Sequence, residues 1–171
     1  MLNTHIVRNT RSRSLGIAGT LALVLMGVTG AEAQQIQTFP GSLCQVSGSA
    51  QDLYYSGVAI ANRGNSTSSA VCPIVRGNSL EGWLEIVVSV RDRHSTLNVT
   101  CVAQARNAMG IAGSGWSQSR STVGEGDQTL FFGAPGVVLP DVGPYVLVCS
   151  LPPMEEVNQP SYIASYSITE P

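Results

Sequence analysis

His94 is the only histidine after residue 33, and it would be the central residue of any acid–base chemistry in this chain. It lies two residues after Asp92, and serines are plentiful, so a Ser-His-Asp hydrolase is one reading. The Gly-x-Ser-x-Gly turn that exposes a nucleophilic serine is missing. Residues 92–95 (DRHS) have the composition of a polar turn, which should project the His94 ring into solvent. The sequence therefore predicts no catalytic residue.

Two tryptophans are candidates for binding a ligand. A flat aromatic ring can stack against the apolar face of a sugar. Trp116 lies among glycines, serines and glutamines, and Trp83 begins an expected strand on its polar face, beside Glu85. The alternative is that each ring is half-buried at one end of the fold and serves packing alone. Trp116 and Trp83 are the candidate contacts to a glycan or another component of the cell envelope.

Four of the eleven acidic residues form two short clusters, at 125–127 and 155–156. Glycoside hydrolysis needs two carboxylates that face each other across a cleft, and neighbours on a turn do not supply that geometry. The turn at 124–127 has oxygen ligands that suit calcium but lacks the ligand spacing of a calcium-binding loop. The chain has no glycine-rich loop followed by lysine and no Cys-x-x-Cys pair. We therefore expect neither a metal nor a cofactor.

The composition limits the classes of protein and partner. The chain has 171 residues and a net charge of −2, and its nine basic residues are all arginines. That length suits one domain, and a 43% hydrophobic content argues against disorder. The slight acidity argues against a nucleic-acid partner.

The first 33 residues have the architecture of a secretory signal peptide. A basic segment precedes a short apolar run at 15–30, which ends in Ala-Glu-Ala33. The run is too short and too rich in glycine for a membrane-spanning helix. We expect cleavage after Ala33 and export to the periplasm or the medium. The mature chain, 34–171, should not span the membrane.

All four cysteines lie in the expected mature chain. An even number of cysteines in an exported protein indicates disulfides, and four allow three pairings. We favour Cys44–Cys72, because this link would fix a loose N-terminal segment, and Cys101–Cys149, because both lie on the apolar face of a strand. The spacing alone does not decide between the three pairings.

Apolar residues alternate with polar ones along most of the mature chain, as in half-buried strands. Eight strands are expected, at residues 54–62, 69–76, 83–91, 97–105, 116–123, 128–133, 145–151 and 161–169. Residues 92–95 should join two of them as an antiparallel pair. In the last strand Tyr162 and Tyr166 should share the core face, with Ile163 as an exception.

Short strands without a useful amphipathic helix predict an all-β fold. We expect an antiparallel β-sandwich of the jelly-roll or Greek-key type over 53–171. It should follow an irregular N-terminal segment at 34–52.

Three passages resemble a group of small exported bacterial proteins of unassigned function. The passages are residues 71–76 (VCPIVR), residues 88–93 (VSVRDR) with 97–101 (LNVTC), and residues 146–153 (VLVCSLPP) with 161–166 (SYIASY). These motifs consist of strands and cysteines, so the resemblance implies a fold and no chemistry.

The sequence favours a non-enzymatic, exported and disulfide-stabilised β-sandwich with a structural or surface-binding role. The first alternative is a carbohydrate-recognition module. The second alternative is a hydrolase that uses carboxylates or His94.

Overall fold

The computed structural model describes residues 35–47, 52–75, 85–106, 112–133 and 144–170, with the backbone alone for 112–115. The expected signal peptide and Trp83 lie outside these residues. Within them, no helix is long and apolar enough to cross a membrane.

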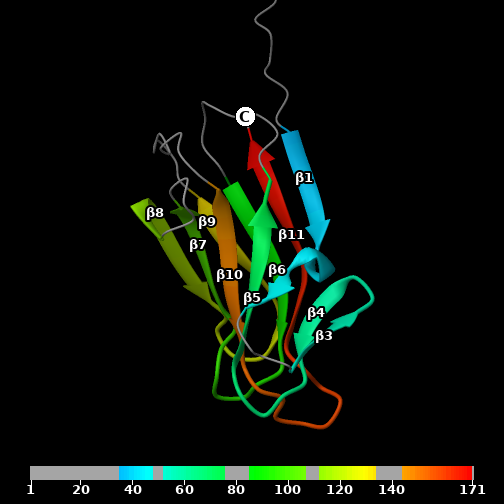
Figure 1. Cartoon of the computed structure of the whole chain (residues 1–171). Helices are drawn as coiled ribbons and strands as arrows, with labels where there is room; N and C mark the ends of the chain where they lie inside the picture. The colour runs from blue at the N-terminus through cyan, green and yellow to red at the C-terminus, as the bar shows by residue number, and fades with distance from the viewer. Residues whose placement is uncertain (1–34, 48–51, 76–84, 107–111, 134–143, 171) are drawn as a thin grey trace, which may run out of the picture. The chain divides into compact units, whose positions relative to one another are not determined.

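The described chain forms two antiparallel sheets (Figure 1). Sheet A comprises β1 (Gln35–Pro40), β3 (Leu53–Ser56), β4 (Ala59–Asn62), β6 (Glu85–Asp92), β9 (Gly126–Gly133) and β11 (Tyr162–Glu170). Sheet B comprises β2 (Gln45–Val46), β5 (Ser68–Ile74), β7 (Thr100–Arg106), β8 (Ala112–Ser121) and β10 (Tyr145–Leu151). One 3-10 turn, η1 (Gly41–Leu43), links β1 to β2.

The order of the strands is that of a jelly roll. Sheet A runs β3-β4-β11-β6-β9, with β1 also paired to β11, and sheet B runs β2-β5-β10-β7-β8. From β4 to β11 the chain passes repeatedly from one sheet to the other, so most strands that are neighbours in a sheet are not consecutive in sequence; β3–β4 and β7–β8 are the exceptions. The prediction of an antiparallel β-sandwich of this type is confirmed.

The predicted pairing across residues 92–95 is wrong. β6 pairs with β11 and β9 in sheet A, whereas β7 pairs with β10 and β8 in sheet B. The connection therefore crosses between the sheets. The reason is that Asp92, expected in a solvated turn, is fully buried and hydrogen-bonds the backbone of the connection.

The expected strand at 54–62 is two strands, β3 and β4. Ser56 pairs with Ala59, so Gly57 and Val58 form a two-residue hairpin loop. Gly57 has φ of 60°, which glycine adopts without steric cost and which the first loop position of a type II′ turn requires. An apolar run begins within this loop, at Val58, and continues into β4, so the sequence does not mark where the turn ends.

The segment at 34–52, expected to be irregular, contains β1, η1 and β2. β1 pairs with β11, and the Phe39 ring stacks on that of Tyr166 with 5.2 Å between centroids. Immediately after β1, a side chain at Gly41 would begin 2.1 Å from the Ile163 carbonyl oxygen. Glycine therefore lets the chain pass close to β11 before it enters sheet B.

The core lies between the inner faces of the two sheets. Sheet A contributes large side chains, chiefly those of Ile60, Ile86, Val88, Val90, Leu130, Phe132, Ile163, Tyr166 and Ile168. Sheet B contributes small ones, Ala70, Ala103, Ala105 and the cysteines, with Ile74, Tyr145, Leu147 and Leu151. The small residues of sheet B thus leave room for the large side chains of sheet A, and the four large residues of sheet B complete the core.

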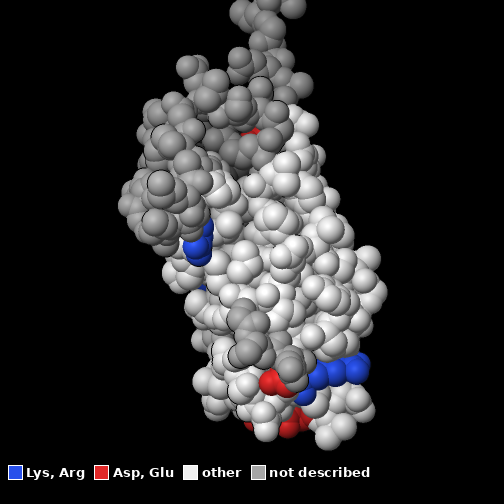
Figure 2. All heavy atoms as spheres, viewed as in Figure 1, with Lys and Arg blue, Asp and Glu red and all other residues white. Residues whose placement is uncertain are grey.

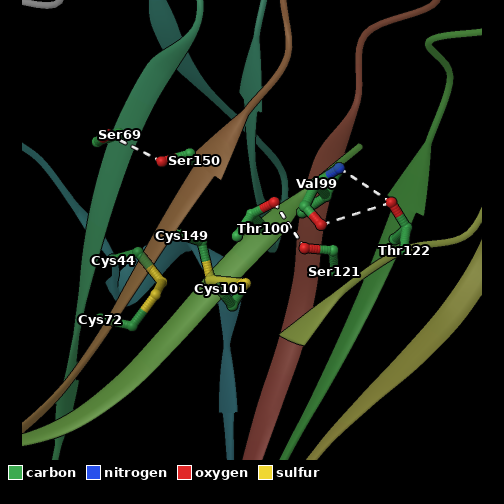
Figure 3. The surroundings of a disulfide bond; sticks show 10 residues. All are labelled: Cys44, Ser69, Cys72, Val99, Thr100, Cys101, Ser121, Thr122, Cys149 and Ser150. Carbon is green, nitrogen blue, oxygen red and sulfur yellow. Dashed lines mark hydrogen bonds between the residues drawn. A yellow bond between two sulfur atoms is a disulfide. The ribbon is translucent and has the colours of Figure 1, made fainter. Parts of the chain in front are cut away.

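Two disulfides, Cys44–Cys72 and Cys101–Cys149, stand on the inner face of sheet B (Figure 3). Cys101 on β7 and Cys149 on β10 are direct register partners, so their link joins neighbouring strands of one sheet. Cys44 immediately precedes β2, and its link to Cys72 ties the N-terminal segment to β5. These are the pairs that the sequence analysis favoured.

The edge strands β8 and β9 lie beside each other on the same side of the sandwich. The Gln118 side chain accepts a hydrogen bond from Gly133 N at 3.1 Å. Arg120 Nε donates to the Phe131 carbonyl oxygen, also at 3.1 Å. Side chains of β8 thus occupy backbone groups of β9, the edge strand of sheet A.

Candidate functional site

The outer face of sheet A carries one row of aromatic and charged side chains. The register places one residue from each of five successive strands in this row: Tyr54, Ala61, Tyr162, Arg91 and Asp127. We call these residues the tyrosine–arginine row. The row lies across the strands near the end of the sandwich that holds the loops between β6 and β7 and between β10 and β11.

A β-bulge places Tyr162 in this row. The register of β11 against β6 shifts between Ile163 and Ser165, so the alternation restarts there. Ile163 and Tyr166 both face the core, and Tyr162 is half-exposed on the outer face. The sequence-based assignment of Tyr162 to the core is therefore wrong, and the exceptional Ile163 was the signal of the bulge.

Arg91 and Asp127 form an ion pair at one end of the row. Arg91 Nη2 donates to Asp127 Oδ2 at 2.5 Å, and Nε lies 2.5 Å from Oδ1. This hydrogen bond is the main cause of a raised pKa of the Arg91 guanidinium. The side chain of Asp127 is 67% exposed, so the pair offers donors and acceptors to solvent.

Arginine side chains also approach both tyrosine rings. The guanidinium carbon of Arg63 lies 3.6 Å from the centroid of the Tyr54 ring, and that of Arg91 lies 6.0 Å from the Tyr162 centroid. Both distances are within the range of cation–π contact. Between the two tyrosines Ala61 is only 1% exposed, so a small residue separates two larger ones.

The neighbouring rows of the same face consist mainly of short side chains. They are Pro40, Ser165, Ser89 and Thr129 in the next row and Thr38, Ser167, Val87 and Phe131 in the row beyond. The tyrosine–arginine row therefore borders a flat and mostly uncharged floor. Figure 2, viewed as in Figure 1, shows few charged side chains among the described residues: most lie toward the lower end, and others lie higher up.

His94 does not project freely into solvent as expected, because its side chain is 12% exposed. Nδ1 accepts hydrogen bonds from the backbone N–H groups of Thr96 and Leu97, at 3.2 and 3.1 Å. It also lies 3.4 Å from Oε2 of Glu155, whose pKa is lowered chiefly by hydrogen bonds from Ser95. A catalytic triad needs a proton on Nδ1 to donate to the acid. Here Nδ1 is an acceptor, which does not suit that role.

Asp92 is buried, and its hydrogen bonds join three connections: those between β6 and β7, between β8 and β9, and between β10 and β11. Its Oδ1 accepts hydrogen bonds from His94 N at 3.0 Å and from the Ser161 hydroxyl at 3.2 Å. Its Oδ2 accepts from Val99 N at 3.0 Å and from the Thr122 hydroxyl. Because four donors satisfy this carboxylate, it positions the loops and is not free for catalysis.

Trp116 is half-buried and packs against the core, with its ring edge-on to Tyr145 at 6.4 Å between centroids. Trp83 lies outside the described residues. Contact of either tryptophan with a ligand stays a prediction. In the described part of the chain, no group of three or more His, Cys, Asp or Glu side chains could hold a metal ion.

No protein-family model matches the chain, and no curated protein matches it. Among solved structures it is similar to the C-terminal CBM6 of LamC, a marine laminarinase from Zobellia galactanivorans, with 13% identity and a TM-score of 0.45 over 79% of this chain and 99% of that one. It is also similar to a xylan-binding module, CBM15, with 16% identity and a TM-score of 0.44 over 81% and 97%. A third is a Podospora anserina GH26-CBM35 β-(1,4)-mannanase, with 13% identity and a TM-score of 0.45 over 80% and 28%. At these identities and TM-scores, the similarity says nothing about a ligand of this chain.

Proposed function

We propose that this protein is a non-catalytic carbohydrate-binding module, exported by its N-terminal signal, whose glycan lies on the outer face of sheet A. The tyrosine–arginine row is the observation that supports it. Tyrosine rings offer apolar stacking surfaces, and the Arg91–Asp127 pair beside them offers hydrogen bonds to hydroxyl groups. Sugars need both kinds of contact at once. The two disulfides suit the oxidising compartment in which such a module would work.

The row supports binding better than it supports hydrolysis. Its one carboxylate, Asp127, is paired with Arg91 and stands on an open sheet face. Glycoside hydrolysis uses two facing carboxylates, which the described residues of this row do not provide. A hydrolase that uses His94 is not supported either, because Nδ1 of His94 accepts hydrogen bonds from backbone N–H groups.

The test is binding of the mature chain to a panel of glycans and insoluble polysaccharides. We expect Tyr162→Ala to weaken binding about fivefold, because it removes a stacking surface worth about 1 kcal/mol. Tyr162→Phe keeps the ring and should retain most of the affinity.

The matched control is Gln104→Ala, at a half-exposed position on the outer face of sheet B. It should bind as the unchanged protein does. Thermal unfolding of every variant separates lost binding from lost folding. Absence of binding to every glycan, or unchanged binding by Tyr162→Ala, would refute the proposal.

A further inference from the structure

We infer that the ligand is an uncharged glycan chain that lies across the strands of sheet A and contacts both Tyr54 and Tyr162. This inference rests on the proposed function and adds the length, direction and charge of the ligand. It follows from the spacing of the two tyrosines and from the neutrality of the Arg91–Asp127 pair.

The spacing of the tyrosines sets a minimum length for the ligand. Tyr54 on β3 and Tyr162 on β11 are separated by Ala61 on β4. Two steps between neighbouring strands amount to about 10 Å. A single sugar ring is too small to cover both tyrosines. Only a chain of several sugars gains both contacts at once.

The row also sets the direction of the chain. Tyr54, Tyr162 and Arg91 follow one line across β3, β11 and β6, so a chain that touches all three must run across the strands. Beside this line the described floor carries the short side chains Ser165 and Ser89. Side chains of this size do not obstruct a chain that lies along the row.

The charges of the row favour uncharged sugars. Arg91 and Asp127 neutralise each other, and together they present donors beside acceptors, as two adjacent sugar hydroxyls require. An acidic sugar at this end would meet the exposed carboxylate of Asp127. Arg63 at the opposite end supplies further donors, which can bind sugar hydroxyl groups as well as they bind a carboxylate.

The two tyrosines should contribute unequally. In the free protein the Arg63 guanidinium covers the Tyr54 ring, so a sugar stacks there only after Arg63 swings aside. Displacing this contact offsets part of the stacking energy. We therefore expect Tyr162 to hold the first sugars and Tyr54 to add affinity when the chain is long enough to reach it.

Calorimetric titration with a length series of neutral oligosaccharides tests this inference, using fragments of the polysaccharide that binds best in the panel. For the unchanged protein, affinity should rise about tenfold between fragments too short to reach Tyr54 and longer ones. Tyr54→Ala should lose that rise and keep the affinity for short fragments. The control is Tyr55→Ala, at the next residue of the same strand, which should keep the rise.

Raising the salt concentration from about 0.05 to about 0.5 M should leave the affinity for the neutral series unchanged, because no charged ligand is screened. If a monosaccharide binds as tightly as the longest fragment, the inference fails while the proposed function stands. Preference for a uronic-acid chain, with binding that weakens as salt rises, would also overturn it. Absence of any binding would refute the proposed function itself.

Discussion

The inner face of sheet A carries branched and aromatic side chains, whereas that of sheet B combines alanines with both disulfides. Neighbouring strands of sheet B are therefore joined covalently at two places, β7 to β10 and the segment before β2 to β5. Sheet A depends on backbone hydrogen bonds and on the burial of large side chains. Apolar side chains from both sheets thus fill the core, and covalent links are added in sheet B alone.

Removing the disulfides should have the largest effect, because it attacks sheet B alone. The sequence separations of 28 and 48 residues correspond to about 3.5 kcal/mol for Cys44–Cys72 and about 4 kcal/mol for Cys101–Cys149 in a chain-entropy model. Their sum approaches the whole free energy of unfolding of an ordinary domain, about 5–15 kcal/mol. Denaturant unfolding with and without reductant measures the loss. An unchanged unfolding midpoint after complete reduction would contradict the comparison.

Truncating a buried side chain of sheet A should cause the second largest loss of stability. Phe132→Ala removes a fully buried ring of β9 and should lower the free energy of unfolding by about 3–5 kcal/mol. Its control is Phe131→Ala, where the preceding ring is 56% exposed on the outer face, and about 0.5 kcal/mol or less is expected. Chemical denaturation of both variants, with disulfides intact, checks the difference. Equal losses at the two positions would show that sheet A does not depend on its inner face.

The smallest effect concerns a contact between the sheets. The Tyr166 hydroxyl, on β11, donates to the Pro73 carbonyl oxygen of β5 at 2.7 Å, and burial raises its pKa from 10.0 to about 12. The unfolded chain then loses this proton at a lower pH than the folded one does. Stability should therefore fall as pH rises from about 10 to 12. The free energy of unfolding, measured across this pH range, should decline less for Tyr166→Phe than for the unchanged protein. Tyr55→Phe, at an exposed ring, should keep the full decline.

Much of the fold could be predicted because it follows from local alternation. In β6 the residues Ile86, Val88 and Val90 occupy the core as their spacing indicates, and in β7 Cys101, Ala103 and Ala105 do so. Local alternation does not indicate to which of the two sheets a strand belongs. It depends on where Asp92 finds donors, among them Thr122 and Ser161 on other connections. No local pattern in the sequence contains that information.

The candidate site could not be predicted for a related reason. Tyr54, Tyr162 and Arg91 are far apart in the sequence and meet only through the pairing of β3, β4, β11 and β6. A single bulge in β11 then reverses the side on which Tyr162 lies. The sequence drew attention instead to Trp116, whose ring packs against the core. Aromatic residue type was therefore an informative signal, and strand register decided which rings reach the surface.

The contact of Gln118 and Arg120 with the backbone of β9 bears on the solubility of the protein. An open strand edge that includes Phe131 would be a template for another chain to add to, the first step toward aggregation. Two polar side chains of β8 already occupy the Phe131 carbonyl and the Gly133 amide, so an incoming strand would have to displace them. Sheet A can in this way keep a hydrophobic strand at its margin without pairing to a second chain.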